Sequence, residues 1–171
     1  GLGMPELGYT MLSDIEDLDY AEALTMADRM VIFRLMAKHV ARELGCIATF
    51  MAKPFQDDFG SASHLNISLA DKESGRNVFE AESGSYSDIA YHFVAGVLAH
   101  AGAICAVTSP TVNSYKRFTS KGFMDEISWA PIYRSWGENN RTLMCRLPVN
   151  RHCLEVRTVD ASVNYHLGIG L

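Results

Sequence analysis

Several features that mark specialised classes of protein are scarce or missing in this sequence of 171 residues. There are only 5 prolines and 13 glycines, and apolar residues make up 48% of the chain, so collagen-like repeats and extensive disorder are excluded. Basic residues are not in excess. The net charge of −5 argues against general affinity for nucleic acid or for anionic lipid. These proportions favour an ordinary globular domain with a hydrophobic core.

The sequence also lacks an apolar run long enough to span a bilayer. The longest stretch without Asp, Glu, Lys or Arg extends over residues 89–115, and it contains two histidines, Pro110 and several hydroxyl side chains. We interpret it as a buried helix that ends by Pro110 and continues into a loop, and we expect no membrane association. No basic segment followed by an apolar core is visible, which predicts a protein without an export signal.

Cysteines are few, and their spacing is not that of a metal site. Cys46, Cys105, Cys145 and Cys153 lie far apart and within apolar segments. This arrangement is typical of reduced, buried thiols, and it predicts a cytoplasmic protein.

Apolar residues at helical spacing predict two helices. The first follows Thr25, which we expect to cap it, and ends before Gly45. Its expected buried face consists of Met30, Phe33, Ala37, Val40 and Leu44. The second begins at Ser87 and Asp88 and runs to about Cys105.

Alternating residues predict strands over residues 64–70, 144–149 and 153–159, and apolar runs predict shorter strands over residues 47–51 and 78–80. The first three would share a polar face that carries His64, Asn66, Ser68, Arg146, Glu155 and Arg157. The opposite, apolar face would be covered by the two helices, which gives an α/β-type domain with a polar front.

A front that combines an imidazole, a carboxylate and several guanidinium groups suits a metal-bound polyphosphate. A simpler interpretation stands beside this one. Glu155 and Arg157, two residues apart, could form an exposed ion pair, His64 could be an ordinary satisfied histidine, and Arg117 and Arg141 could be solvated loop charges. From the residues alone, the sequence predicts a mixed domain with a candidate anion-binding face.

Six segments, in this order and spacing, resemble glutamine synthetase. They are residues 47–54 (IATFMAKP), 60–68 (GSASHLNIS), 109–117 (SPTVNSYKR), 140–141 (NR), 146–148 (RLP) and 154–157 (LEVR). The match extends over nearly all of the chain from Asp19 onward. Residues 19–29 (DYAEALTMADR) and 129–131 (WAP) are most similar to the glutamine synthetase-like branch, which includes γ-glutamylmethylamide synthetases and type III enzymes.

The resemblance implies a fold and an activity. The fold would be α+β, a curved, mainly antiparallel sheet, half of a barrel, backed by helices. Residues 1–171 would be a partial catalytic domain without the amino-terminal β-grasp domain and without the first part of the catalytic domain. The activity would be an ATP-dependent ligase that joins the γ-carboxylate of L-glutamate to ammonia or a small amine through a γ-glutamyl phosphate. Mg²⁺ or Mn²⁺ would assist, and the assembly would be a ring-shaped homo-oligomer, a dodecamer of two hexameric rings. We expect these residues alone to be inactive.

The resemblance also implies roles for individual residues. Metal ligands would be His64 and Glu155, and the catalytic arginines would be Arg117 and Arg141. Glutamate and the transferred phosphoryl group would be bound by Gly60, Arg117, Arg141 and Arg157. The nucleotide would be contacted by Asn66, Ser68, Arg141 and Arg146.

Two positions depart from the family pattern. Counting back from Ala27 places Ile15 where relatives have a glutamate metal ligand, and Glu16 is one residue away. A bulge could restore Glu16, the ligand could be missing, or the segment could be shortened. Trp129 stands where ammonia-using enzymes have a flap glutamate, so it either favours a substituted amine or packs the flap. These departures leave open two alternatives to a ligase, an inactive homologue that keeps the fold and ring contacts, and a plain ATP-binding module.

Overall fold

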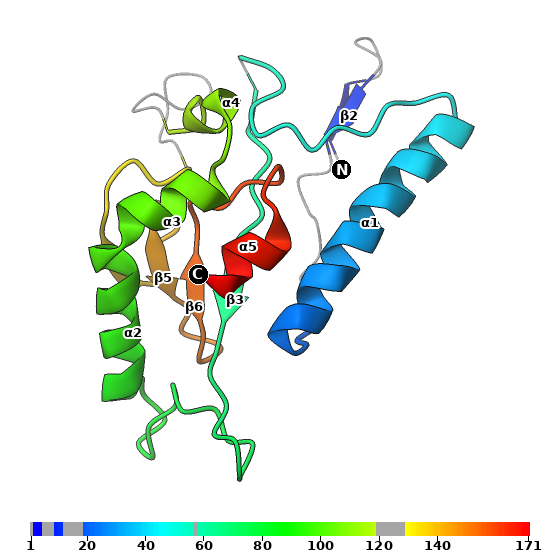
Figure 1. Ribbon diagram of the computed structural model, residues 1–171. Coiled ribbons are helices and arrows are strands. Elements are labelled where there is room, and N and C mark those ends of the chain that lie inside the picture. Colours follow the sequence, from blue (N-terminus) through cyan, green and yellow to red (C-terminus); the bar gives the residue numbers. More distant parts are fainter. Residues whose placement is uncertain (1, 5–8, 12–18, 57, 119–128) are drawn as a thin grey trace.

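The computed structural model describes residues 2–4, 9–11, 19–56, 58–118 and 129–171 (Figure 1). Its elements in chain order are β1 (Leu2–Met4), β2 (Tyr9–Met11), α1 (Ala23–Glu43), β3 (Leu65–Ile67), α2 (Asp88–Ala99), α3 (Ala101–Thr108), α4 (Val112–Tyr115), β4 (Trp136–Glu138), β5 (Cys145–Leu147), β6 (Leu154–Val156) and α5 (Tyr165–Gly170).

Four short strands form an open sheet in the order β3-β6-β5-β4. β6 pairs antiparallel with both β3 and β5, whereas β4 runs parallel to β5. A separate antiparallel pair joins β1 to β2. The predicted α+β fold with a mainly antiparallel sheet is therefore confirmed.

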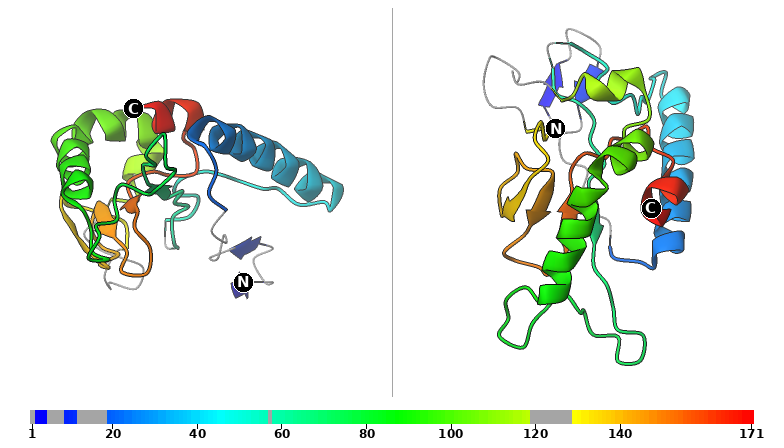
Figure 2. Two further views of the ribbon diagram at one scale, coloured as in Figure 1. Left: turned by 90° about the horizontal axis from the view of Figure 1, so that it is seen from below. Right: turned by 60° about the vertical axis from the view of Figure 1, so that its left-hand side comes forward.

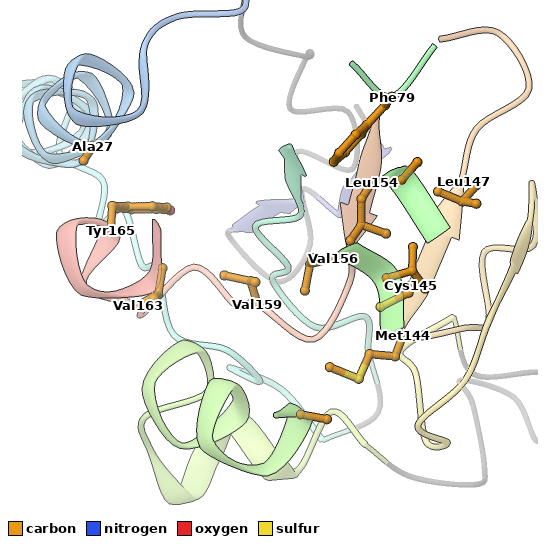
Figure 3. Close-up of a cluster of buried hydrophobic side chains, with 13 residues drawn as sticks. Ala27, Phe79, Met144, Cys145, Leu147, Leu154, Val156, Val159, Val163 and Tyr165 are labelled. Carbon is orange, nitrogen blue, oxygen red and sulfur yellow. The ribbon is translucent and has the colours of Figure 1, made fainter. Parts of the chain in front are cut away.

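The core lies on the apolar side of β5 and β6. Cys145 and Leu147 from β5, and Leu154 and Val156 from β6, pack with Phe79 and with α2 and α3 (Figure 3). The same core continues through Val159 and Val163 to Tyr165 in α5 and Ala27 in α1 (Figure 3). Burial of each such Val or Leu side chain contributes about 1.5–3 kcal/mol to the free energy of unfolding. Because side chains alternate along a strand, this burial turns Arg146 and Glu155 to the opposite face.

The predicted buried face of α1 is only partly right. α1 packs beside α5, to one side of the sheet (Figures 1 and 2). The covered side of α1 consists mainly of small residues. Ala27 is buried, and Met30 and Ala37 are half-buried. The other members of the predicted face, Phe33, Val40 and Leu44, are exposed.

The predicted start of α1 is also corrected. The helix is capped by Glu22, whose carboxylate accepts a hydrogen bond from the Thr25 backbone N–H at 3.0 Å. Thr25 therefore lies inside the first turn. A carboxylate at the cap also interacts favourably with the positive end of the helix dipole.

The second predicted helix begins where expected but divides in two. Ser87 caps α2 by accepting a hydrogen bond from the Ala90 backbone N–H at 3.3 Å. At His100 the backbone leaves the helical range, with φ −98° and ψ 12°, and α3 continues at 73° to α2. The bend places Ala101 in the core.

In the described ranges, no single helix has the length and hydropathy to cross a membrane, although α2 and α3 would pass such a test as a bent pair.

Two predicted strands are wrong. Residues 47–51 have no regular structure, and Ile47 is 94% exposed. Residues 78–80 form no strand, and isolated bridges pair Ala70 with Asn77 and Glu80 with Tyr86. An apolar run becomes a strand only beside a partner strand, and none pairs with residues 47–51 among the described residues.

Candidate functional site

Three residues that the sequence predicts for the polar front lie in one row across the sheet. Asn66 in β3 is directly opposite Glu155 in β6, and Glu155 is directly opposite Arg146 in β5. Directly opposed residues on neighbouring strands point to the same face. The structure therefore brings Asn66, Glu155 and Arg146 together.

Glu155 is the centre of this face, although it is 4% exposed. Its Oε2 accepts a hydrogen bond from Arg146 Nη1 at 2.5 Å, and its Oε1 accepts one from Arg157 Nη1. Burial would raise the pKa of Glu155, but hydrogen bonds from His64 and Arg146 and the charge of Arg157 outweigh this and lower it to about 2. Glu155 is thus ionised, and the alternative of an exposed ion pair with Arg157 is wrong.

His64 directly precedes β3 and completes the cluster. Its Nδ1 lies 3.1 Å from Glu155 Oε1 and 3.3 Å from Arg157 Nη1. Burial holds the pKa of His64 below its usual range, so the ring is neutral near pH 7. In the tautomer that donates Nδ1–H to Glu155, Nε2 carries the lone pair that a metal ion requires.

Asn139 holds the second arm of Arg146, and the sequence analysis missed it. Its Oδ1 accepts a hydrogen bond from Arg146 Nη2 at 2.6 Å. Asn139 has φ +52°, in the left-handed region that asparagine tolerates better than most residues. The Asn139–Asn140 pair, typical of a turn, is the signal that could have identified it.

Arg157 links the cluster to Trp129 and Arg141. Its Nη2 donates to the Trp129 backbone carbonyl at 3.3 Å. The guanidinium of Arg141 lies over the indole ring of Trp129, 6.0 Å from its centre, and Arg141 itself is exposed. Arg141 therefore lies at the exposed edge of the site.

Gly60 and Arg117 form one packed unit. A Cβ at Gly60 would lie 2.8 Å from the Ala52 carbonyl oxygen and 2.8 Å from Arg117 Cγ, so the site requires glycine. Arg117 is buried and donates from Nη1 to the Thr158 carbonyl at 3.2 Å. Burial lowers the pKa of Arg117 to about 10, opposed by the charge of Asp160. Even so, Arg117 stays charged near pH 7.

The predicted nucleotide contacts on β3 have different surroundings. Asn66 Oδ1 accepts hydrogen bonds from Arg151 Nη2 at 3.1 Å and, more weakly, from Cys153 Sγ at 3.8 Å. Arg151 is a further residue that the sequence analysis did not select. Ser68 is half-buried and lies just beyond the end of β3.

The metal-binding capacity of the described residues is partial. His64 and Glu155 supply an imidazole and a carboxylate, but both carboxylate oxygens are held by guanidinium groups. No group of three His, Cys, Asp or Glu side chains suited to a metal occurs in the described part of the chain. Ile15 and Glu16 lie outside the described residues. The two side chains therefore do not complete a metal site by themselves.

The cluster as a whole carries an excess of positive charge. Arg146 and Arg157 surround a single carboxylate, and Arg117 is close enough to His64 for its charge to help lower the pKa of that ring. Guanidinium groups are always charged and bind the oxygens of carboxylates and phosphates in pairs. This face is therefore suited to anionic ligands.

A separate groove of about 300 Å³ lies between α1 and the start of α5, and it is lined by Val31, Arg34 and residues 162–166.

Comparison with known proteins gives consistent matches. The family model "Glutamine synthetase, catalytic domain" matches residues 14–170. A glutamate–methylamine ligase of Methyloversatilis universalis is 40% identical over 169 residues, which cover 96% of this chain and 35% of that protein. A glutamine synthetase of Pyrococcus woesei is 45% identical over 151 residues, which cover 86% of this chain and 32% of that protein.

Solved structures agree with these matches. The structure titled "GmaS/ADP complex-Conformation 1" superposes with a TM-score of 0.75 at 39% identity, covering 88% of this chain and 35% of the other. The structure titled "Apo GmaS without ligand" gives a TM-score of 0.76 at 40% identity. The chain thus spans about a third of the length of the relatives it matches.

Proposed function

Because this chain belongs to the glutamine synthetase family, we propose that it forms part of an ATP-dependent ligase that joins the γ-carboxylate of L-glutamate to ammonia or a small amine. The observation that carries the proposal is the buried cluster of Glu155, Arg146, Arg157 and His64 on the polar face of the sheet. Burial of such a cluster carries a large desolvation penalty, and buried charges with shifted pKa values are concentrated at functional sites.

The charged groups suit phosphoryl transfer to a carboxylate. In the proposed reaction the γ-carboxylate of glutamate attacks the terminal phosphorus of ATP, the bond from that phosphorus to the bridging oxygen breaks, and ADP leaves. A neutral amine then attacks the carbonyl carbon of the γ-glutamyl phosphate, loses a proton and displaces phosphate. Negative charge collects on the transferred group, and fixed guanidinium groups stabilise it. We assign this role to Arg117 and Arg141, with Arg157 and the backbone at Gly60 helping to bind glutamate.

We assign the nucleotide to the same face. Asn66, Ser68, Arg141 and Arg146 would contact ATP, and His64 and Glu155 would supply two donors for Mg²⁺ or Mn²⁺, the rest coming from outside the described residues. When bound, such a cation neutralises phosphate charge. Arg146 and Arg157 would then exchange their contacts with Glu155 for contacts with phosphate oxygens.

Trp129 supports a substituted amine as the second substrate. The side chain is 58% exposed and is thus accessible to a ligand. One face of its ring already meets the Arg141 guanidinium. We therefore propose that the ring selects an alkyl group by apolar contact.

A second candidate is an inactive homologue that keeps the fold and the ring contacts. It is favoured by the occupation of both Glu155 oxygens by arginines and by the incomplete set of metal donors among the described residues. A binding experiment separates the two candidates. The ligase requires saturable binding of ATP with Mn²⁺, and the inactive homologue predicts none.

The activity test uses the whole ligase of which we propose this chain to be a part, because we expect residues 1–171 alone to be inactive. The assay contains glutamate, ATP, Mg²⁺ or Mn²⁺, and either methylamine or ammonia, and it follows the γ-glutamyl product by mass spectrometry together with the release of ADP. We expect an ATP-dependent product, with higher kcat/KM for methylamine. Trp129→Ala should lower the methylamine-to-ammonia ratio about tenfold, since one methyl contact is worth about 1–3 kcal/mol. No product with any amine would contradict the ligase, and an unchanged ratio would contradict the role of Trp129.

The partial-domain organisation and the ring assembly remain proposals, which light scattering of the purified protein would test.

A further inference from the structure

The loop of residues 148–153, which joins β5 to β6, is held by a single hydroxyl group. Tyr86 Oη lies 2.8 Å from the Pro148 carbonyl oxygen, 2.8 Å from that of Arg151 and 3.0 Å from that of Cys153. These three acceptors span the whole loop, although Tyr86 is more than 60 residues away in sequence. One side chain thus fixes the path of the chain between the two central strands.

Residues near Tyr86 reinforce this contact at His152. Asn77 Nδ2 donates to the His152 carbonyl at 2.6 Å, and His152 Nε2 lies 3.0 Å from the Gly84 carbonyl. The His152 ring meets the Tyr86 ring edge-on at 5.2 Å, and its Nδ1 lies 3.8 Å from Glu80. The segment of residues 77–86 therefore clamps the loop, and we call these contacts the Tyr86 clamp.

The clamped loop carries a charged group toward the candidate site. Arg151 Nη2 donates to Asn66 Oδ1 at 3.1 Å, and Asn66 is directly opposite Glu155 in the sheet. The side chain of Arg151 thus reaches the polar face, while its own carbonyl is held by Tyr86. The clamp thus contacts the backbone from which this guanidinium extends.

A hydroxyl group has one proton and can satisfy only one of three carbonyl acceptors at a time. Its contribution to the free energy of unfolding is therefore small, because one hydrogen bond is worth about 0.5–1.5 kcal/mol. Burial raises the pKa of Tyr86 to about 12, so the proton is retained at working pH. The three contacts of Tyr86 Oη are therefore better explained by a role in positioning the loop than by their contribution to the free energy of unfolding.

We propose that Tyr86 is a positioning residue, which sets the affinity of the site for the phosphates of ATP by fixing Arg151 beside Asn66. This inference rests on the proposed function, because it places ATP on the same face. Arg151 is a further group that contacts the triphosphate, beside those assigned above, and Tyr86 acts through it. Neither residue has a role in the reaction with the amine.

Tyr86→Phe in the full chain tests the proposal, since it removes only the hydroxyl group. Binding of ATP with Mn²⁺, measured by titration calorimetry, should weaken about 3- to 10-fold, as expected for the loss of one hydrogen bond. In the activity assay, KM for ATP should rise by a similar factor, with kcat and KM for glutamate unchanged. The matched control is Tyr91→Phe, which removes a hydroxyl from the neighbouring ring, 6.5 Å away, without touching the loop.

A double-mutant cycle separates positioning from a general structural effect. Arg151→Gln should weaken ATP binding by itself, and adding Tyr86→Phe should then cause no further loss. If Tyr86→Phe lowers the melting temperature but leaves ATP affinity unchanged, or if the two effects are additive, the positioning role is overturned. If the unmodified chain binds no ATP at all, the proposed function fails, and this inference fails with it.

Discussion

Strands β5 and β6 and helix α1 distribute their charged and apolar residues in opposite ways. In the strands, Arg146 and Glu155 are 8% and 4% exposed. In α1, Ile32 and Met36 are 55% and 60% exposed. Hydropathy alone would predict the reverse. The difference teaches that burial here follows the contacts each element makes. Arg146 and Glu155 pair with each other on a central sheet, whereas α1 packs mainly against α5.

The comparison also predicts where the molecule is sensitive to change. Removing one member of a buried ion-pair network leaves the others buried and unpaired, which is far more costly than the net value of the network. Removing an exposed apolar side chain changes little. Substitutions should therefore have large effects among the charges of the sheet and small effects on the outer face of α1.

The largest effect is expected for Glu155→Ala. Arg146, Arg157 and His64 would lose their shared partner, and the free energy of unfolding should fall by about 3–5 kcal/mol. Urea unfolding followed by circular dichroism measures this change. A loss below about 1 kcal/mol would show that solvent already screens the cluster.

Acid should lower the free energy of unfolding, because the unfolded chain takes up protons that the buried charge cluster excludes in the folded protein. His64 has a lowered pKa when folded, so the unfolded chain gains a proton first as pH falls below 6.5, and stability begins to decline. Glu155 adds a further loss as pH falls from 4.5 toward about 2, because its folded pKa is lowered as well. Stability contributed by both groups is thus present at neutral pH. Urea midpoints between pH 7 and pH 3 measure the decline, and Glu155→Gln should flatten its lower part.

A smaller effect is expected for Gly60→Ala. The added Cβ would press against the Ala52 carbonyl and the Arg117 side chain, which should cost about 1–3 kcal/mol of unfolding free energy. Gly75→Ala is an informative control, because Gly75 has open space around it but a φ of +71°. The loss of unfolding free energy in Gly75→Ala would therefore come from backbone strain alone. A larger loss at position 75 than at position 60 would contradict the packing explanation.

The smallest effect is expected on the outer face of α1. Met36→Gln should change the free energy of unfolding by no more than about 0.5 kcal/mol, because Met36 is already exposed. Ala27→Gln, on the buried side of the same helix, is the matched comparison and should be clearly destabilising. Equal effects at the two positions would contradict the assignment of the helix faces.

Local patterns were sufficient to predict parts of the fold and site. Alternation around Glu155 and Arg146 placed both on one face opposite Leu154 and Leu147, and Ser87 correctly marked the start of α2. Family resemblance selected residues that the structure brings together, among them His64, Glu155 and Arg157.

Features that depend on distant contacts could not be predicted in this way. Apolar residues of α1 occur on several sides of the helix, so the sequence does not reveal which side contacts α5. The bend at His100 and the exposure of Ile47 depend on packing partners rather than on propensity. The Tyr86 clamp joins segments more than 60 residues apart, and no short motif indicates it.

Calorimetric titration of ATP in the presence of Mn²⁺ tests the central assignment most directly, with the unmodified chain compared with Glu155→Gln. The buried charge cluster predicts saturable, Mn²⁺-dependent binding by the unmodified chain and loss of that binding in a Glu155→Gln protein that remains folded by circular dichroism. Equal binding by the two proteins, or none by either, would contradict the assignment of this face as the nucleotide and metal site.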